Sequence, residues 1–555
     1  MTSTTESTDE APRRSMPVRL GRAGILVLIR STTRVILLVA AIVALFLVLR
    51  AYRSLQGPPL ERWHVFVPDE LSISQLDDAA WSDYLEAEEA LMQSVAAEVT
   101  AKLPKELRVV SNRYATESPM HPARIIEGGA ADWNRSFILQ PCDAAGAPTG
   151  RPALGALVLL HGLTDSPYSL RHVARHYATR GFVAVGIRLP GHGTVPGGLT
   201  NAEWEDWLAA ARLAVREARR QAGPEAPLHL VGYSMGGAIA MKYALDSLEN
   251  ETLERPDRVV LMSPMVGVTR FAEFAGIAGL PAMFPAFAKS AWIDRLPEFN
   301  PVKYNSFPVN AATQSHRLSV EVQAQAERMA AARRMSNLPP VLTFQSVLDA
   351  TVSTDAVLAG LYAHLPANGS ELVLFDVNRS VKFGPLLSDA ARGALERMLP
   401  PLPQRYTITI ITNTEDAQDE AIERSIKAGG TEESRRDLPE FFPPVIFSLS
   451  HVAIPFPLED PLYGLTPDLS ESFGVRLGTI TARGERGALV MSLDALMRAS
   501  SNPLFPYVLR RLDEGIADPA PRVQSVPTLS APAKASAPVR EAKESSSYQG
   551  DGGAP

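Results

Sequence analysis

The 555-residue sequence contains one cysteine, Cys142, and has no CxxC pair and no Cys/His cluster. A single thiol cannot form an intramolecular disulfide, and nothing in the sequence has the ligand spacing of a zinc site. Beyond the N-terminus there is no block of Lys and Arg, and the formal net charge is −7. This charge balance argues against a nucleic-acid-binding surface. We therefore expect no metal and no nucleic-acid partner.

Both ends of the chain lack the large apolar residues that a core requires. Residues 516–555 are rich in Pro, Ala, Ser and Gly, and residues 1–23 are polar and basic. Such segments cannot bury enough apolar surface to offset the entropy of ordering them. We predict a disordered tail over 516–555 and an unfolded basic N-terminus. Between them, a chain that is 46% hydrophobic is long enough for one large domain with insertions, or for two domains.

A long apolar run lies near the N-terminus. Val35 to Leu49 are fifteen consecutive apolar residues between Arg34 and Arg50. At about 1.5 Å per residue, they span about 22 Å of a hydrocarbon core about 30 Å thick. The apolar stretch before Ser31 and snorkelling of the flanking arginines can supply the remainder. We predict a single-pass transmembrane anchor over residues 24–50.

The arginines around this run predict its orientation. Six arginines precede Val35, whereas Arg50, Arg53 and Arg62 follow the run. The positive-inside rule then places the N-terminus in the cytoplasm and the rest of the chain on the extracytoplasmic, periplasmic side. A cleavable signal peptide also fits the length of the run, but "LRAYRSLQG" is a poor cleavage site.

Residues 51–150 carry no recognisable chemistry. Trp81, Leu85, Met92, Val95 and Val99 recur at helical spacing, which predicts an amphipathic helix over 79–102. The stretch "RSFILQP" is typical of a strand. We expect this accessory segment to pack against the domain that follows.

From residue 151 to about 266, apolar runs alternate regularly with helical stretches. The strand-like runs "GALVLLHG", "FVAVGIRLPGHG", "LHLVGYS" and "DRVVLMSP" are separated by three helical ones. Continuous apolar strands of this kind predict an α/β fold with a mostly parallel, doubly wound sheet covered on both faces. Functional sites in such sheets form at the carboxyl ends of the strands.

The motif "GYSMG", Gly232 to Gly236, joins one of these strands directly to a helix. A bare GxSxG pattern is weak by itself, so its position carries the inference. Gly232 and Gly236 allow a sharp strand-to-helix turn that exposes the hydroxyl of Ser234 at the sheet edge, and the backbone N–H of Met235 faces the same space. The pattern favours Ser234 as a nucleophile over a structural serine in a glycine-rich turn.

The stretch "LLHGLTDSP" follows the first strand of the core. A loop here can present the N–H of Leu163 toward the same oxygen as the N–H of Met235, and two such donors would form an oxyanion hole. His161 in this stretch is better explained as a residue that braces the loop than as a catalyst.

In this order, "HGLTDSP", "RLPGHGT" and "GYSMGG" resemble the α/β-hydrolase fold. Within that fold the sequence is similar to the group of monoacylglycerol lipases, carboxylesterases and serine aminopeptidases. The resemblance covers residues 151 to about 266 well and the remainder patchily. It implies a catalytic triad in chain order Ser, Asp, His, with the acid after a late strand and the histidine after the last one.

The acid that this order requires is found after the strand-like stretch "VLTFQ". Asp349 lies in the loop that follows, and Asp355 lies six residues further on, where it is expected to cap the next helix. We favour Asp349.

Only two histidines follow Asp349, namely His364 and His451. His364 falls within a predicted helix that precedes the next strand, so His451 remains as the general base. The gap of 102 residues between Asp349 and His451 is longer than is usual in the resembled group. We interpret residues 378–444 as a large insertion. The strand "RYTITIITN" within it could itself be the strand that precedes the histidine loop.

Between about 266 and 338 the alternation breaks down, at the place where the resembled fold carries a helical lid. Aromatic and Met side chains in this stretch could line an acyl pocket or form the lid's own core: Phe271, Phe274, Met283, Phe284, Phe287 and Trp292. The hydrolase domain as a whole is expected over 151–515.

These features predict a membrane-anchored serine hydrolase that cleaves lipid-like or acylglycerol-type carboxylic esters without a cofactor. A serine aminopeptidase-like peptidase, a thioesterase or an acyltransferase would use the same triad. A noncatalytic membrane-tethered scaffold is the alternative from another class. The presence of all three triad residues in order argues against it.

Overall fold

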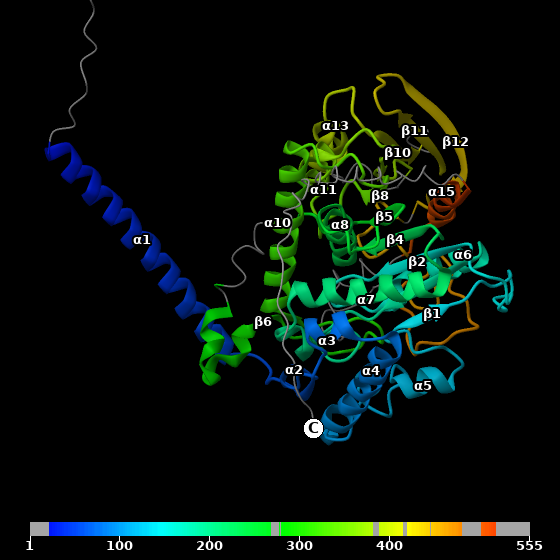
Figure 1. Ribbon diagram of the computed structural model, residues 1–555. Coiled ribbons are helices and arrows are strands. Elements are labelled where there is room, and N and C mark those ends of the chain that lie inside the picture. Colours follow the sequence, from blue (N-terminus) through cyan, green and yellow to red (C-terminus); the bar gives the residue numbers. More distant parts are fainter. Residues whose placement is uncertain are drawn as a thin grey trace, which may run out of the picture. The chain divides into compact units, whose positions relative to one another are not determined.

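The computed structural model describes residues 22–267, 277, 279–380, 388–413, 419–444, 446–479 and 501–517. A ten-stranded sheet lies at its centre (Figure 1), in the order β1-β3-β2-β4-β5-β8-β9-β10-β11-β12. Seven neighbouring strands pair in parallel, from β3 to β10, and the other three are antiparallel. The strands are β1 (Phe137–Leu139), β2 (Gly155–Leu160), β3 (Phe182–Ile187), β4 (Leu228–Tyr233), β5 (Arg258–Met262), β8 (Val341–Ser346), β9 (Glu371–Phe375), β10 (Thr407–Asn413), β11 (Glu420–Ile426) and β12 (Glu433–Phe441).

Helices cover both faces of the sheet, as the continuous apolar strands predict. On one face, alternate residues of β2 pack with the helices α7 (Trp204–Ala222), α8 (Met235–Glu249), α10 (Val309–Ala331) and α11 (Thr354–Gly360). On the other face, the intervening residues pack with α6 (Arg171–Thr179) and α15 (Phe505–Ala517). Every residue of β2, β3 and β4 is buried. Each large apolar side chain removed from water contributes about 1.5–3 kcal/mol, so this core fixes the positions of the strand ends.

The accessory segment packs against the domain through buried charges. Its helices are α2 (Arg62–Val65), α3 (Ile73–Asp78), α4 (Trp81–Val95), η1 (Ala96–Thr100), η2 (Lys105–Leu107) and α5 (Pro122–Glu127). Arg188, after β3, is fully buried and pairs with Glu70 at 2.7 Å and with Glu88 at 3.1 Å.

The amphipathic helix predicted over 79–102 is present as α4 and η1. Its buried face carries Tyr84, Glu88 and Leu91, whereas Leu85 is exposed.

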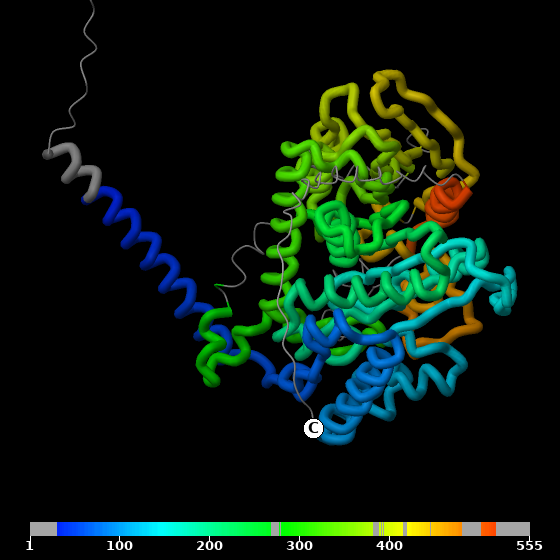
Figure 2. Tube along the Cα trace, viewed as in Figure 1, coloured from blue at the N-terminus to red at the C-terminus, as the bar shows by residue number. Residues whose placement is uncertain are grey.

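The apolar run near the N-terminus forms a single long helix, α1 (Arg22–Leu55), drawn in blue in Figure 2. Within the described residues, one helical span is long and apolar enough to cross a membrane: Arg30–Leu55, with a mean hydropathy of 2.7. A signal sequence near the N-terminus would satisfy the same criteria of length and composition. The basic residues 1–21 lie outside the described part of the chain.

The region in which we expected a lid is partly described. It contains η6 (Leu280–Met283), η7 (Pro285–Ala291), a small hairpin of β6 (Trp292–Asp294) and β7 (Phe307–Pro308), and the long helix α10. Phe271 and Phe274 lie outside the described residues. Of the other predicted lid residues, Trp292 is buried, whereas Met283 and Phe284 are exposed to solvent. The latter two therefore belong neither to a lid core nor to a closed pocket wall.

The segment between Asp349 and His451, which includes the predicted insertion over 378–444, contributes strands to the central sheet. It contains η8 (Tyr362–His364), α12 (Asp389–Arg392) and α13 (Ala394–Met398), and its three strands β10–β12 extend the central sheet. β10 pairs in parallel with β9, and β11 and β12 follow as an antiparallel hairpin. The strand "RYTITIITN" is thus the last parallel strand, and the described residues 446–450 form no strand. Apart from residues 516 and 517, which end α15, the predicted tail lies outside the described residues.

Candidate active site

Ser234 occupies a sharp turn between β4 and α8. Its backbone φ and ψ are 55° and −118°, a left-handed conformation that non-glycine residues rarely adopt. The turn is possible because Gly232 and Gly236 have no β-carbon. A β-carbon on Gly236 would come within 1.9 Å of the Leu160 carbonyl oxygen, and one on Gly232 within 2.3 Å of the Gly236 oxygen. Both glycines of the motif are therefore required by close backbone packing, and the strained serine is held at the end of β4.

Three predicted side chains meet at this point. The Nε2 atom of His451 lies 2.9 Å from the Oγ atom of Ser234, and its Nδ1 atom lies 2.8 Å from the Oδ2 atom of Asp349. An ionised carboxylate only accepts hydrogen bonds, so Nδ1 carries the proton and Nε2 is the acceptor for the serine hydroxyl. The arrangement can remove the hydroxyl proton and stabilise the resulting imidazolium.

Asp349 is held in its ionised form by its surroundings. Burial alone would favour the neutral acid, but the attraction and hydrogen bond of His451 keep the pKa of Asp349 below its usual value. The backbone N–H groups of Thr351 and Val352 also donate to its Oδ1 atom, at 2.8 and 2.9 Å. The carboxylate side chain is 0% exposed. It is therefore fixed in both charge and orientation.

The loop that follows β2 and the start of α8 lie beside Ser234. A β-carbon on Gly162 would lie 3.2 Å from Cβ of Ser234, so the loop that carries Leu163 passes beside the serine. Met235 is the first residue of α8. Within the described part of the chain, the N–H groups of Leu163 and Met235 take part in no backbone hydrogen bond outside the helices and strands. The predicted role of these two N–H groups as oxyanion donors requires that they be uncommitted in this way.

The loop after β2 is braced by His161, as the sequence indicates. The Nε2 atom of this buried imidazole accepts a hydrogen bond from the N–H of Leu189 at 3.0 Å. Burial and the neighbouring His192 lower the pKa of His161 well below its usual value, so the ring is neutral. On the same loop, Thr164 has a φ of 60°, and its carbonyl accepts from the N–H of Tyr304 at 2.7 Å. The loop is thereby fixed at both ends.

The two alternative residues lie elsewhere. His364 is in η8, before β9, and makes no contact with the serine in the described structure. Asp355 is exposed in the first turn of α11, and the cap of that helix is Ser353, whose side chain accepts from the N–H of Ala356. Our expectation that Asp355 would cap the helix is wrong. Ser353 competes better because it immediately precedes the first helical residue.

Two residues near the site were not predicted from the sequence. Gln345, on β8, donates to the Oδ2 atom of Asp349 at 3.2 Å. Tyr233, next to the serine, donates to the carbonyl of His451 at 3.3 Å, and its ring lies 5.4 Å from the imidazole. Gln345 is buried in a strand and gives no local signal. Tyr233 stands within the GxSxG motif, where its side chain type is not prescribed.

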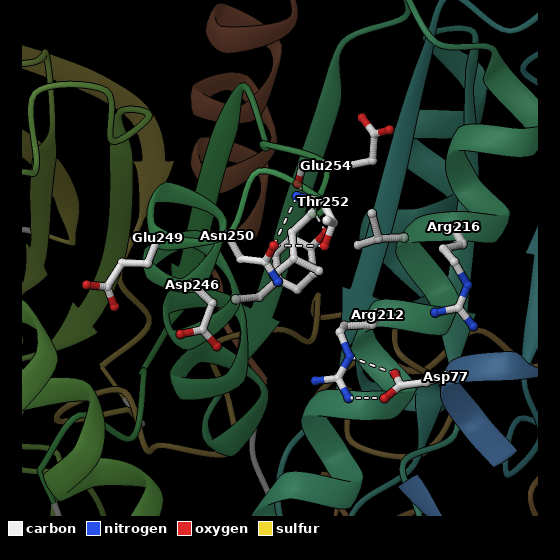
Figure 3. A pocket seen from close by; sticks show the side chains of 11 residues that line it. Asp77, Arg212, Arg216, Asp246, Glu249, Asn250, Thr252 and Glu254 are labelled. Atoms are coloured by element: carbon white, nitrogen blue, oxygen red, sulfur yellow. Dashed lines mark hydrogen bonds and ion pairs between the residues drawn. The ribbon is translucent and has the colours of Figure 1, made fainter. Parts of the chain in front are cut away.

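A surface pocket of about 580 Å³ lies apart from these residues, between α7, α8 and the loop after α8 (Figure 3). Its charged side chains are paired within the protein. Arg212 forms a two-pronged ion pair with Asp77 at 2.8 Å, and Arg216 donates to the carbonyl of Leu76. Nothing in the pocket requires a ligand. Among the described residues, no group of three or more His, Cys, Asp or Glu side chains could hold a metal ion.

Comparison with known proteins agrees with the fold. Residues 151–377 match the family described as "Serine aminopeptidase, S33". The chain is 25% identical over 191 residues to a thermostable monoacylglycerol lipase from Bacillus sp. (strain H-257), an alignment that covers 34% of this chain and 69% of that protein.

Two solved structures illustrate the range of similar proteins. One comes from work on LipS and LipT, two metagenome-derived lipolytic enzymes, with 19% identity, a TM-score of 0.35, and coverage of 44% of this chain and 88% of that one. The other is a soluble variant of monoglyceride lipase from Saccharomyces cerevisiae, with 15% identity, a TM-score of 0.34, and coverage of 43% and 81%.

Proposed function

We propose that this chain cleaves carboxylic esters with Ser234 as nucleophile, His451 as general base and Asp349 as the supporting acid. The similarity to a serine aminopeptidase family and to a monoacylglycerol lipase supports this proposal. One observation carries the proposal: the two hydrogen bonds of 2.9 and 2.8 Å that link the three side chains. Residues that lie far apart in the chain meet in the geometry that nucleophilic catalysis requires.

The reaction follows from the positions of the atoms. His451 Nε2 takes the hydroxyl proton while Ser234 Oγ attacks the carbonyl carbon of the ester. The negative charge that forms on the carbonyl oxygen is stabilised by the N–H groups of Leu163 and Met235. The imidazolium then gives its proton to the departing alkoxide, and an acyl-enzyme remains. Water, activated by the same imidazole, attacks the acyl carbon and releases the acid.

Asp349 stays ionised throughout this cycle. Its carboxylate holds Nδ1–H of His451, so the imidazole presents Nε2 to the serine, and it stabilises the positive charge of the imidazolium. The backbone donors at Thr351 and Val352 oppose any rotation of the carboxylate.

We propose lipid-like esters of the acylglycerol type as substrates. The proposal draws on the similarity to a monoacylglycerol lipase and on the helix α1, which we propose anchors the enzyme in a membrane. The arginine asymmetry around α1 favours a cytoplasmic N-terminus and an extracytoplasmic catalytic domain.

A panel of p-nitrophenyl esters of increasing chain length, with a monoacylglycerol and an aminoacyl p-nitroanilide, tests the proposed reaction. We expect the wild-type enzyme to hydrolyse the esters and Ser234→Ala to lose the activity. Preferential cleavage of the anilide would favour a peptidase, and equal turnover by Ser234→Ala would refute the proposed nucleophile. Recovery of the full-length chain in the membrane pellet after a carbonate wash tests the anchor, and a trimmed soluble chain would contradict it.

A further inference from the structure

Large apolar side chains are exposed on segments that adjoin the end of α1 or the residues that follow it. We call this set the apolar patch: Leu55, Val110, Leu280, Met283, Phe284 and Leu296. Met283 is 79% exposed, Val110 67% and Phe284 64%. Contiguous exposed apolar side chains mark surfaces that another apolar phase covers.

Hydrogen bonds join the segments of this patch to α1 and to the residues that directly follow it. Arg50, near the end of the helix, donates to the carbonyl of Trp292 at 2.6 Å. Lys289 donates to the carbonyl of Gly57 at 3.0 Å, and Arg295 to that of Pro58 at 2.8 Å. Figure 2 shows η6 and η7, in green, against the lower end of the blue helix.

The accessory segment belongs to the same face. A mostly apolar pocket of about 260 Å³ is lined by residues from three stretches, 58–64, 107–112 and 295–298. The loop that carries Val110 therefore adjoins both the stretch that follows α1 and the stretch that follows β6. Three stretches of the sequence thus meet around this pocket, close to the end of α1.

The sequence of α1 determines the depth of this face relative to a bilayer. Arg50 is the first charged residue after the fifteen apolar residues that would cross the hydrocarbon core. The groups bonded to Arg50 then lie at the boundary between acyl chains and headgroups. Arg53, Lys289 and Arg295 in the same neighbourhood suit anionic headgroups, with Asp294 as an opposing charge.

We propose that the apolar patch binds to the phospholipid bilayer, at the surface of the leaflet from which α1 emerges. Met283, Phe284 and Val110 enter the boundary between headgroups and acyl chains, and the enzyme draws its ester from the membrane instead of from water. The inference rests on the proposed anchor and on the proposed ester hydrolysis, and it assigns to the accessory segment a part in orienting the enzyme.

Environment-sensitive labels on the full-length chain test the proposal. Cys142→Ser removes the only native thiol. Single cysteines are then introduced as Phe284→Cys and Val110→Cys, and as the controls Leu154→Cys and Leu469→Cys, which are 69% and 67% exposed. Each is labelled with NBD (nitrobenzoxadiazole) and reconstituted into phosphatidylcholine vesicles with 20% phosphatidylglycerol, with and without doxyl-labelled lipid. An Ile42→Cys label reports on α1 itself.

We expect a blue shift and strong doxyl quenching for the labels at 284 and 110, and little change at 154 and 469. Quenching at 42 together with unshifted emission at 284 and 110 would overturn the proposal while leaving the anchor intact. No quenching at 42 would contradict both the anchor and the patch.

Activity separates this inference from the proposed reaction. Val110→Asp should hydrolyse p-nitrophenyl butyrate in detergent at the wild-type rate but lose about tenfold or more against a long-chain monoacylglycerol embedded in vesicles. Leu469→Asp is the matched control and should lose neither activity. An equal loss on both substrates in Val110→Asp would count against a membrane role, and absence of esterase activity in the wild type would refute the reaction while leaving the label test valid.

Discussion

Ser234 and His451 lie 2.9 Å apart, yet the protein holds them in different ways. The serine belongs to a strand, a turn and a helix that are consecutive in the sequence. His451 lies among turns that form no regular element in the described residues. The position of the proposed nucleophile is encoded by a few neighbouring residues, whereas the position of the proposed base depends on contacts with distant ones.

The contacts of the histidine segment show this dependence. Asp460, a little further along the chain, is fully buried and pairs with Arg171 at 2.6 Å and with His172 at 2.9 Å. Asn502 donates to the carbonyl of Ile454 at 3.2 Å. Arg171 belongs to α6, and Asn502 lies just before α15. The segment that carries His451 is therefore held by contacts with two distant parts of the chain.

The largest effect should come from the base itself. We expect His451→Ala to lower kcat by about 10⁴-fold to 10⁶-fold with little change in stability, because the loss of a triad histidine leaves only binding and the oxyanion donors. His364→Ala serves as the control. Near-normal turnover in His451→Ala, with loss in His364→Ala, would contradict the assignment.

The turn around Ser234 should tolerate no added side-chain volume at its glycines. In Gly236→Ala the new methyl group would collide with the carbonyl of Leu160, which is backbone and cannot move aside. We expect a loss of about 3 kcal/mol in the free energy of unfolding. Gly430→Ala, where the nearest atom is 3.3 Å away, is the matched control in a chemical denaturation experiment. Similar stabilities of the two variants would show that the turn is less tightly packed than described.

The segment that positions His451 should be destabilised when the ion pair between Asp460 and Arg171 is broken. Asp460→Asn leaves the buried Arg171 without a charged partner, which should cost about 3–5 kcal/mol. We also expect kcat to fall more than KM changes, since the histidine segment is loosened while the rest of the site is intact. Asp468→Asn, at a solvent-exposed carboxylate, is the control. Loss of stability with unchanged kcat would show that the segment holds His451 without this pair.

The same pair should produce a pH dependence of stability. Burial alone would raise the pKa of Asp460, but Arg171 and the hydrogen bond from His172 hold it well below its usual value. The folded state therefore binds this proton less readily than the unfolded state. The stabilisation is fully present above the unfolded value of about 3.9 and is lost as the pH falls below it. Denaturation curves of wild type and Asp460→Asn should converge toward acid, and a constant difference would contradict this account.

The contrast between the two residues also explains what the sequence could predict. The strands and helices around Ser234 follow from apolar runs and from glycines in a fixed pattern, so that region is predictable from its own residues. His451 could be identified only by elimination, because its neighbours form no regular element. The hairpin β11–β12 gave no clear strand signal because β12 exposes charged residues along most of its length, as edge strands often do.

The accessory segment was the least predictable part for a similar reason. The ion pairs of Arg188 with Glu70 and Glu88 join residues about a hundred positions apart, and no local sequence pattern indicates them. Glu88 stands on the buried face of an amphipathic helix, a position where sequence reasoning expects an apolar residue.

The central claim, that Ser234 is the activated nucleophile, is tested most directly by covalent labelling with a fluorophosphonate. The probe reacts with a serine whose proton is removed by an adjacent base, and peptide mass spectrometry identifies the modified residue. We predict a single adduct on Ser234 in the wild type, none in Ser234→Ala, and labelling slowed by orders of magnitude in His451→Ala. An adduct on another residue, or hydrolytic activity in a wild type that never labels Ser234, would contradict the account.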